Sequence, residues 1–170
     1  MQITAQAIGI VGAAIAIASF QCRSNKKFFI MQCVSTLLFT THFFLLGAYT
    51  GFILNALGFL RSVILFNRGK KWAQSPIFLW GLMAAFLVTG ILTFNGIFSL
   101  FPTAAMLIST AFMWTDDGKK IRTAQFFAVS PLWLIYNISV FSISGIITES
   151  FNLISVAISF IRYRKTGFSK

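Results

Sequence analysis

Seven long apolar runs set the main limit on what this chain can fold into. They cover residues 5–22, 28–46, 50–67, 75–94, 97–114, 123–141 and 144–162. A helix needs about 20 apolar residues to cross the hydrocarbon core of a bilayer, and each run approaches this length. The chain is 57% hydrophobic and only 10% charged, whereas soluble domains are usually about a quarter charged. We therefore predict an all-α integral membrane protein with seven transmembrane helices.

The basic residues fall between alternate runs, and this spacing predicts the orientation. Thirteen of the 14 Lys and Arg residues lie at or beyond the ends of the first, third, fifth and seventh runs, while the other connections carry no charge. Cytoplasmic loops are enriched in Lys and Arg. We expect the N-terminus outside and the C-terminus in the cytoplasm. The lipid bilayer is then the expected partner, and the net charge of +11 needs no nucleic acid to explain it.

Several connections are short and contain glycine, which is typical of tight turns between antiparallel helices. They read "GAYT" at 47–50, "NG" at 95–96 and "SISG" at 142–145. The stretch "TDDGKK" at 115–120 is predicted to be a turn, because it offers too few oxygen ligands for a metal loop. Cys22 and Cys33 are expected to be reduced thiols. With one histidine, no Cys-x-x-Cys and no P-loop motif, neither a metal nor another cofactor is predicted.

An internal repeat appears when the sequence is shifted by 94 positions. Gly51 then aligns with Gly145, Phe66 with Phe160 and Arg68 with Arg162, and the ends of the runs and the basic loops align as well. Runs one to three thus correspond to runs five to seven in the same orientation, which requires one further helix between them. We predict two parallel three-helix repeats, at residues 1–72 and 97–170, joined by a linker helix at 73–96. This 3+1+3 plan is known among parallel-repeat transporters, whose solutes bind between the repeats.

Three stretches of the sequence also resemble a known family. They are "HFFLLGAYTGFILNA" at 42–56, "TESF" at 148–151 and "FIRYRK" at 160–165. They are similar to the YgjV-type bacterial inner membrane proteins, whose shape resembles the wider group of SWEET, PQ-loop and nicotinamide riboside transporters. The resemblance implies a multi-pass protein of the bacterial inner membrane that carries a small solute, and it supplies no substrate.

The chain departs from the wider group in two respects. No Pro-Gln pair occurs anywhere, so the PQ-loop signature is absent. The second repeat has Pro102 and Pro131, but the matching positions in the first repeat are Ile8 and Leu37. SWEET-like carriers use prolines in the first two helices of each repeat as hinges, so the sequence does not predict a symmetric rocking motion here.

Five polar residues are predicted to share one layer in the outer half of the membrane. Counted from the ends of the runs, His42, Asn55, Tyr136, Asn137 and Glu149 lie at similar depths. A charged group inside a membrane helix usually faces the bundle or a water-filled cavity. We interpret Glu149 as a charge or hydrogen-bond acceptor for a solute, Asn55 and Asn137 as amide ligands, and His42 as a proton-sensitive partner of Glu149. The alternative for each is a hydrogen bond that holds helices together.

Two further residues complete the candidate site. Trp133 lies one helical turn before Asn137, so that it presents an aromatic wall on the same face, or it packs in the core or against lipid. Arg61 lies inside the third run. Its side chain either extends to the cytoplasmic edge of the membrane or stands at the inner mouth of a solute pathway, where it attracts an anion or acts as a gate.

These features favour a carrier for a small polar metabolite, with or without coupling to protons, that uses no ATP. The alternative is a receptor or an accessory subunit of a partner protein, although the loops offer little material for a signalling domain. An intramembrane enzyme is disfavoured, because the single His and one Glu have no suitable Ser or Cys beside them. The sequence leaves open whether the protein forms a homo-oligomer.

Overall fold

The computed structural model describes residues 2–19 and 25–165, and no strand occurs among them. In chain order the elements are α1 (Gln2–Ser19), α2 (Asn25–Leu45), α3 (Tyr49–Phe66), the short 3-10 helix η1 (Lys71–Gln74), α4 (Pro76–Leu92), the 3-10 turn η2 (Ile97–Ser99), α5 (Leu100–Trp114), α6 (Gly118–Ala124), the π-helical turn η3 (Gln125–Val129), α7 (Ser130–Ser139) and α8 (Ile143–Lys165). Cys22 lies outside the described residues, and Cys33 is a free thiol.

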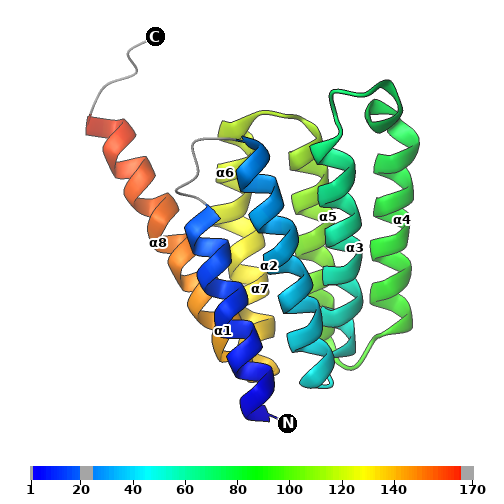
Figure 1. Ribbon diagram of the computed structural model, residues 1–170, viewed down its shortest axis with the longest axis vertical. Helices are drawn as coiled ribbons and strands as arrows, with labels where there is room; N and C mark the ends of the chain where they lie inside the picture. The colour runs from blue at the N-terminus through cyan, green and yellow to red at the C-terminus, as the bar shows by residue number, and fades with distance from the viewer. Residues whose placement is uncertain (1, 20–24, 166–170) are drawn as a thin grey trace.

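These elements form seven helical rods, as the seven apolar runs predict (Figure 1). The turn η2 leads directly into α5, and α6, η3 and α7 follow one another without a break, so each of these groups makes one rod. Two stretches, Tyr49–Phe66 and Ile97–Trp114, are long and apolar enough by themselves to cross a bilayer, and four shorter apolar helices accompany them. The prediction of an all-helical protein is confirmed for the part of the chain that the structure describes.

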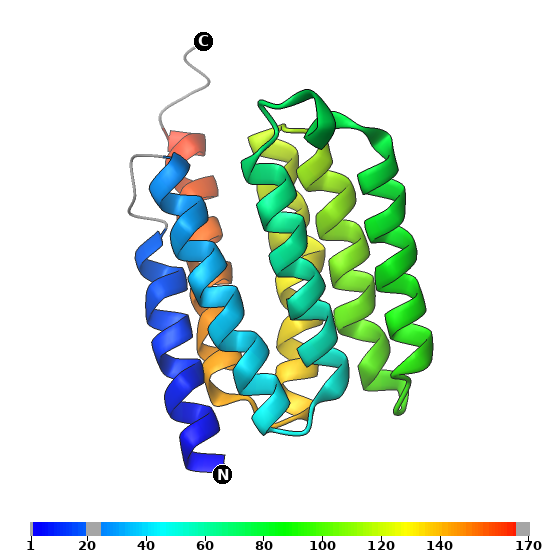
Figure 2. The ribbon, with the colours of Figure 1, turned by 45° about the vertical axis from the view of Figure 1, so that its right-hand side comes forward.

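Six of the rods form a closed ring, and the rod α4 packs on its periphery. Around the ring, α1 contacts α2, α2 contacts α3, α3 contacts α5, α5 contacts α7, α7 contacts α8, and α8 returns to α1. The helix α4 packs against α3 and α5 (Figures 1 and 2). In this order α3 and α8 occupy opposite positions, with the interior of the ring between them.

The outward surface of the bundle is strongly apolar. On α4 alone, Ile77, Trp80, Ile91 and Leu92 are each at least 66% exposed. A soluble monomer rarely exposes so many large apolar side chains together, whereas lipid tails are a suitable environment for them. The buried residues include large apolar side chains such as Phe43, Phe86 and Trp133, and also several serines and threonines, Asn137, His42 and Arg61.

A stripe of small residues lets α1 approach its neighbours closely. Ala5, Gly9, Ala13 and Ala16, spaced three or four apart, are all buried. A methyl group added to Gly9 would lie 2.1 Å from Ser144 Oγ and 2.7 Å from His42 Nδ1. This stripe therefore joins α1 closely to α2 and α8.

Glycine forms the turn in two of the three glycine-containing connections predicted from the sequence, but not in the third. Gly47 and Gly96 adopt positive φ angles of 71° and 86°, as glycine permits at the end of a helix. In the third connection, however, the residue with positive φ is Phe141, at 53°. Gly145 lies within α8 instead, where a Cβ atom would meet Asn137 Oδ1 at 2.1 Å. This glycine permits close helix contact, and the turn itself lies at 140–142 and not at the predicted 142–145.

The predicted turn at 115–120 is shorter than expected. A helix already begins at Gly118, so the sixth rod starts five residues before the apolar run at 123. The carboxylate of Asp117 accepts a hydrogen bond from the backbone N–H of Lys120 at 3.3 Å. Such a bond satisfies a free donor at the start of a helix, and apolarity alone cannot reveal it.

Candidate functional site

A cavity of about 620 Å³ lies inside the ring. Every rod of the ring contributes to its wall, and α4 contributes none of the residues that line it. Volumes of about 300–1,000 Å³ are usual for sites that bind small molecules. The polar side chains in the lining are Gln32, Ser35, Thr36, Asn55, Arg61, Ser62, Ser109, Gln125, Asn137, Thr148, Glu149 and Asn152.

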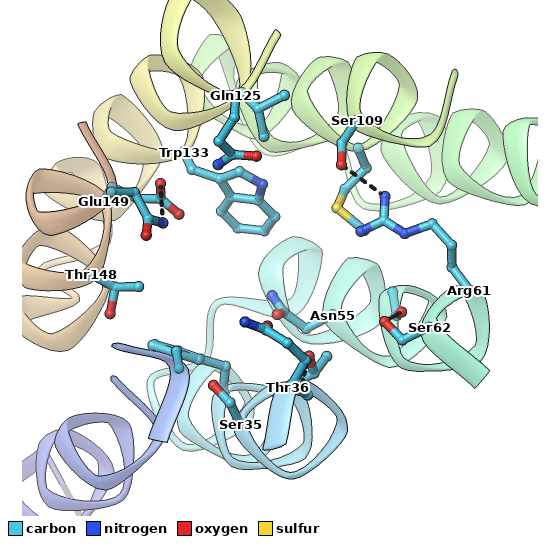
Figure 3. Close-up of a pocket in the computed structure, with 18 of the residues that line it drawn as sticks. Ser35, Thr36, Asn55, Arg61, Ser62, Ser109, Gln125, Trp133, Thr148 and Glu149 are labelled. Carbon is cyan, nitrogen blue, oxygen red and sulfur yellow. Dashed lines mark hydrogen bonds between the residues drawn. The ribbon is translucent and has the colours of Figure 1, made fainter. Parts of the chain in front are cut away.

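Glu149 is on the α8 wall of this cavity (Figure 3). The amide of Asn152, one turn further along α8, donates a hydrogen bond to Glu149 Oε2 at 3.3 Å. The buried hydroxyl of Ser130 also interacts with this carboxyl group. Gln125 Nε2 in turn donates to Ser130 Oγ at 2.9 Å. The carboxylate therefore faces the interior and belongs to a polar network, as an acid within a membrane span should.

Gln125 and Ser130 owe their positions to an irregular segment that the sequence analysis did not anticipate. Residues Gln125–Val129 form a π-helical turn, and Pro131 follows within the first turn of α7. Proline has no N–H to donate to the preceding turn, which disturbs the regular helix. Such π-bulges are frequent at functional sites. Here the irregular segment contributes both Gln125 and Val129 to the cavity lining.

Arg61 is on the opposite wall and is buried, with only 8% of its surface exposed. Its Nη1 atom donates hydrogen bonds to Ser109 Oγ at 3.1 Å and to Thr110 Oγ1 at 2.9 Å. The guanidinium carbon lies 5.9 Å from the centre of the Phe86 ring, which is within the range of a cation–π interaction. Arg61 thus turns toward α5 and α4 and does not extend to the basic end of the bundle.

The charge of Arg61 is incompletely satisfied. Its buried Nε atom has no hydrogen-bond partner. Both described ion pairs join residues near the α5–α6 turn, Arg68 with Asp116 and Lys120 with Asp117, so no carboxylate in the described chain neutralises Arg61. A buried charge without a counter-charge is costly, because the loss of hydration is not offset.

Three other predicted residues also line the cavity. Asn55 donates from Nδ2 to the carbonyl of Gly51, one turn earlier, at 2.9 Å. Asn137 is 2% exposed, and its Oδ1 atom has no hydrogen-bond partner. The indole ring of Trp133 stacks on Phe43 with ring centres 6.0 Å apart. Trp133 therefore serves the core and the cavity wall at once.

His42 and Tyr136 are the two predicted residues that the structure places elsewhere. His42 Nδ1 bonds to the carbonyl of Ala5 at 2.7 Å, and Nε2 bonds to the hydroxyl of Ser142 at 2.8 Å. The hydroxyl of Tyr136 accepts a bond from the backbone N–H of Gly51 at 2.9 Å. Neither residue lines the cavity. Both connect helices, and the expected pairing of His42 with Glu149 was wrong.

Helix geometry explains this correction. Depth in the membrane can be counted along the sequence, but the direction of a side chain around its helix follows the period of 3.6 residues. On α2 the cavity face carries Gln32, Ser35, Thr36, Phe39 and Phe43. His42 is about 100° away from Phe43 and points toward α1. Residues at one depth therefore do not all face the cavity, because depth alone does not fix this rotation.

The same periodicity could have revealed residues that the sequence analysis missed. Gln32, Ser35 and Thr36 form a polar stripe at helical spacing in an otherwise apolar run. Ser62, Ser109 and Thr148 are weaker signals, because serine and threonine also bond to their own helix backbone. Ser62 and Thr148 do so here, at 2.9 and 2.8 Å. Only the assembled structure shows that they also line the cavity.

Comparisons with known proteins agree with this membrane bundle. The family Imp-YgjV, described as "Bacterial inner membrane protein", matches residues 3–167. The chain is also 26% identical over 163 residues to "Inner membrane protein YgjV" of Escherichia coli (strain K12), covering 94% of this chain and 84% of that protein. No solved structure matches the chain. The family match extends over all seven rods.

Proposed function

The chain belongs to the Imp-YgjV family of bacterial inner membrane proteins, and from this premise we propose that it carries a small polar solute across the inner membrane. The observation that supports this function is the cavity of about 620 Å³, lined by amide, hydroxyl and charged side chains, at the centre of a bundle whose outside is apolar. A purely structural membrane bundle has little reason to retain such a polar interior, because unpaired polar groups are costly away from water.

The proposed architecture is the 3+1+3 plan, with repeats at 1–72 and 97–170 and a linker at 73–96. The order of the ring supports it. If α1, α2 and α3 correspond to α5, α7 and α8, then the contact between α3 and α5 is equivalent to the contact between α8 and α1. The helix α4 has no counterpart and is on the periphery, as a linker should be. By the positive-inside tendency, the basic ends of α3 and α8 face the cytoplasm.

In this proposal Glu149, Asn55, Asn137, Trp133 and Arg61 contact the solute. His42 and Tyr136 act indirectly, because they fix the helices around it. Opening to either side requires the two halves of the ring to shift at the seams between α3 and α5 and between α8 and α1. Among the described residues, a π-turn occurs only in the second half, where Pro131 follows it, so the larger local rearrangement is expected there.

Uptake of radiolabelled solutes into proteoliposomes tests this function. A panel of sugars, nucleosides, amino acids and vitamin precursors should yield flux for at least one compound. The variant Glu149→Gln should reduce that flux, whereas Asp116→Asn removes an acid outside the membrane and serves as the matched control. If a correctly folded protein gives no flux for any class, the carrier function is refuted. A stoichiometric partner recovered from native membranes would then support an accessory subunit.

A further inference from the structure

Two charges of opposite sign face the same cavity without meeting. Arg61 is on the α3 wall and Glu149 is on the α8 wall, on opposite sides of the cavity (Figure 3). Both described ion pairs lie elsewhere, so no ion pair joins these two residues to each other or to another described side chain. Their neutral partners, the hydroxyls at Arg61 and the amide of Asn152 at Glu149, leave both charges uncompensated.

Unsatisfied hydrogen-bonding atoms accompany this separation of charge. On the α3 side, the buried Nε of Arg61 is a donor without an acceptor. On the side of α7 and α8, the buried Oδ1 of Asn137 is an acceptor without a donor. Buried polar atoms are rarely left without a partner. These two atoms therefore call for an acceptor on the α3 wall and for a donor on the wall formed by α7 and α8.

The chemistry of each wall indicates which group would satisfy it. A guanidinium binds carboxylate and phosphate through charge-assisted bonds, often through two nitrogens at once. A carboxylate suits an ammonium group, whose N–H donors it accepts. The indole ring of Trp133 forms part of the wall of the same cavity and offers an apolar surface for the carbon skeleton of a solute (Figure 3).

We propose that the solute is a zwitterion, an organic molecule whose carboxylate binds Arg61 and whose ammonium group binds Glu149, on the wall that also carries Asn137. This inference rests on the proposed function and narrows it to amino-acid-like compounds. A site with one charge of each sign selects against molecules that carry only one of them, because the opposite buried charge is then left unpaired.

Ligand binding to the purified full chain in lipid nanodiscs tests the inference without requiring transport. The probes are leucine and 6-aminohexanoate, two zwitterions with different charge separations, together with analogues that each lack one charge. For leucine, N-acetylleucine lacks the ammonium charge and leucinamide lacks the carboxylate charge, and N-acetylleucinamide, which lacks both, serves as the neutral control. Tryptophan fluorescence and thermal stabilisation report binding. At least one zwitterion should bind about tenfold or more tightly than its single-charge analogues, equivalent to ~1.4 kcal/mol.

Variants should remove this preference one end at a time. Arg61→Gln should weaken the binding of the zwitterion and of N-acetylleucine while leaving the binding of leucinamide unchanged. Glu149→Gln should weaken the binding of the zwitterion and of leucinamide while leaving the binding of N-acetylleucine unchanged. Lys70→Gln and Asp116→Asn remove one charge of each sign outside the cavity and should change nothing. Because each variant is compared across ligands, a general loss of folding would appear as equal weakening of all probes, and that result counts against the proposal.

The outcomes separate this inference from the carrier function. Tighter binding of zwitterions with no flux in proteoliposomes would refute the carrier function and still support the zwitterion site. Flux of neutral or singly charged solutes alone would support the carrier function and refute the zwitterion site. The inference also fails if single-charge analogues match the zwitterions, or if none of the probes binds at about 10 mM, where even weak sites are occupied.

Discussion

Replacing Gly9 by alanine should destabilise the bundle, although the same change usually stabilises a helix. The added methyl group would lie 2.1 Å from Ser144 Oγ and within 3 Å of two atoms of the His42 ring. Ser144 cannot simply rotate away, because its hydroxyl also bonds to His42 Nε2 at 3.2 Å. The imidazole is held in turn by Ala5 and Ser142. Relief of the overlap therefore breaks at least one buried hydrogen bond.

The magnitude follows from three contributions. Overpacking of a dense interior costs about 1–3 kcal/mol, and the loss of one hydrogen bond adds about 0.5–1.5 kcal/mol. Alanine restores about 0.5–1 kcal/mol relative to glycine within a helix. Addition of these ranges gives an expected decrease of about 0.5–4 kcal/mol in the free energy of unfolding.

Gly81→Ala provides the matched control. Gly81 is on the exposed side of α4, and nothing lies within 4 Å of its added methyl group. This change should leave stability unchanged or raise it by up to about 1 kcal/mol. Equilibrium unfolding of both variants in mixed detergent micelles measures the difference. If Gly9→Ala proves as stable as Gly81→Ala, the close contact of α1 with α2 and α8 is incorrect.

Three further variants separate structural from functional residues. Tyr136→Phe removes the acceptor for Gly51 N–H and should lower stability by about 1 kcal/mol in the same unfolding assay, without changing the order of solute preference. His42→Ala leaves the Ala5 carbonyl and the Ser142 hydroxyl without this partner and should cost about 2–5 kcal/mol through lost bonds and a cavity; unchanged stability would argue against the helix-joining role. Arg61→Met removes an uncompensated buried charge, so the free energy of unfolding should stay equal to that of the wild type or rise by about 1 kcal/mol or more, while solute flux is lost. A strongly destabilised but fully active variant would contradict the assignment.

Periodic and compositional features of the chain were predictable from the sequence. The apolar runs predict the seven rods, because a bilayer demands helices of nearly fixed length. The small-residue spacing of Ala5, Gly9, Ala13 and Ala16 predicts a packed face of α1. Glu149 and Arg61 stand out because ionisable groups are rare within spans, and both line the cavity.

What could not be predicted depends on rotation about each helix and on local irregularity. His42 and Asn55 have similar depths, yet only Asn55 lines the cavity, because neighbouring helices set which way each residue points. The π-turn at Gln125–Val129 has no reliable signature beyond Pro131, so the hydrogen bond between Gln125 and Ser130 was missed. The orphaned atoms of Arg61 and Asn137 appear only once every potential partner has been placed.

The central claim is that the interior of this ring holds water-accessible polar groups while its exterior faces lipid. Single cysteines introduced into a background with Cys22 and Cys33 replaced by serine test it directly, through labelling by a membrane-impermeant thiol reagent in vesicles of both orientations. Cysteines at Asn55, Ser62 and Asn152, which line the cavity, should react. Those at Leu60, Ile147 and Ile154, which are 48–60% exposed on the outer surface, should stay unlabelled. The reverse pattern would contradict the account.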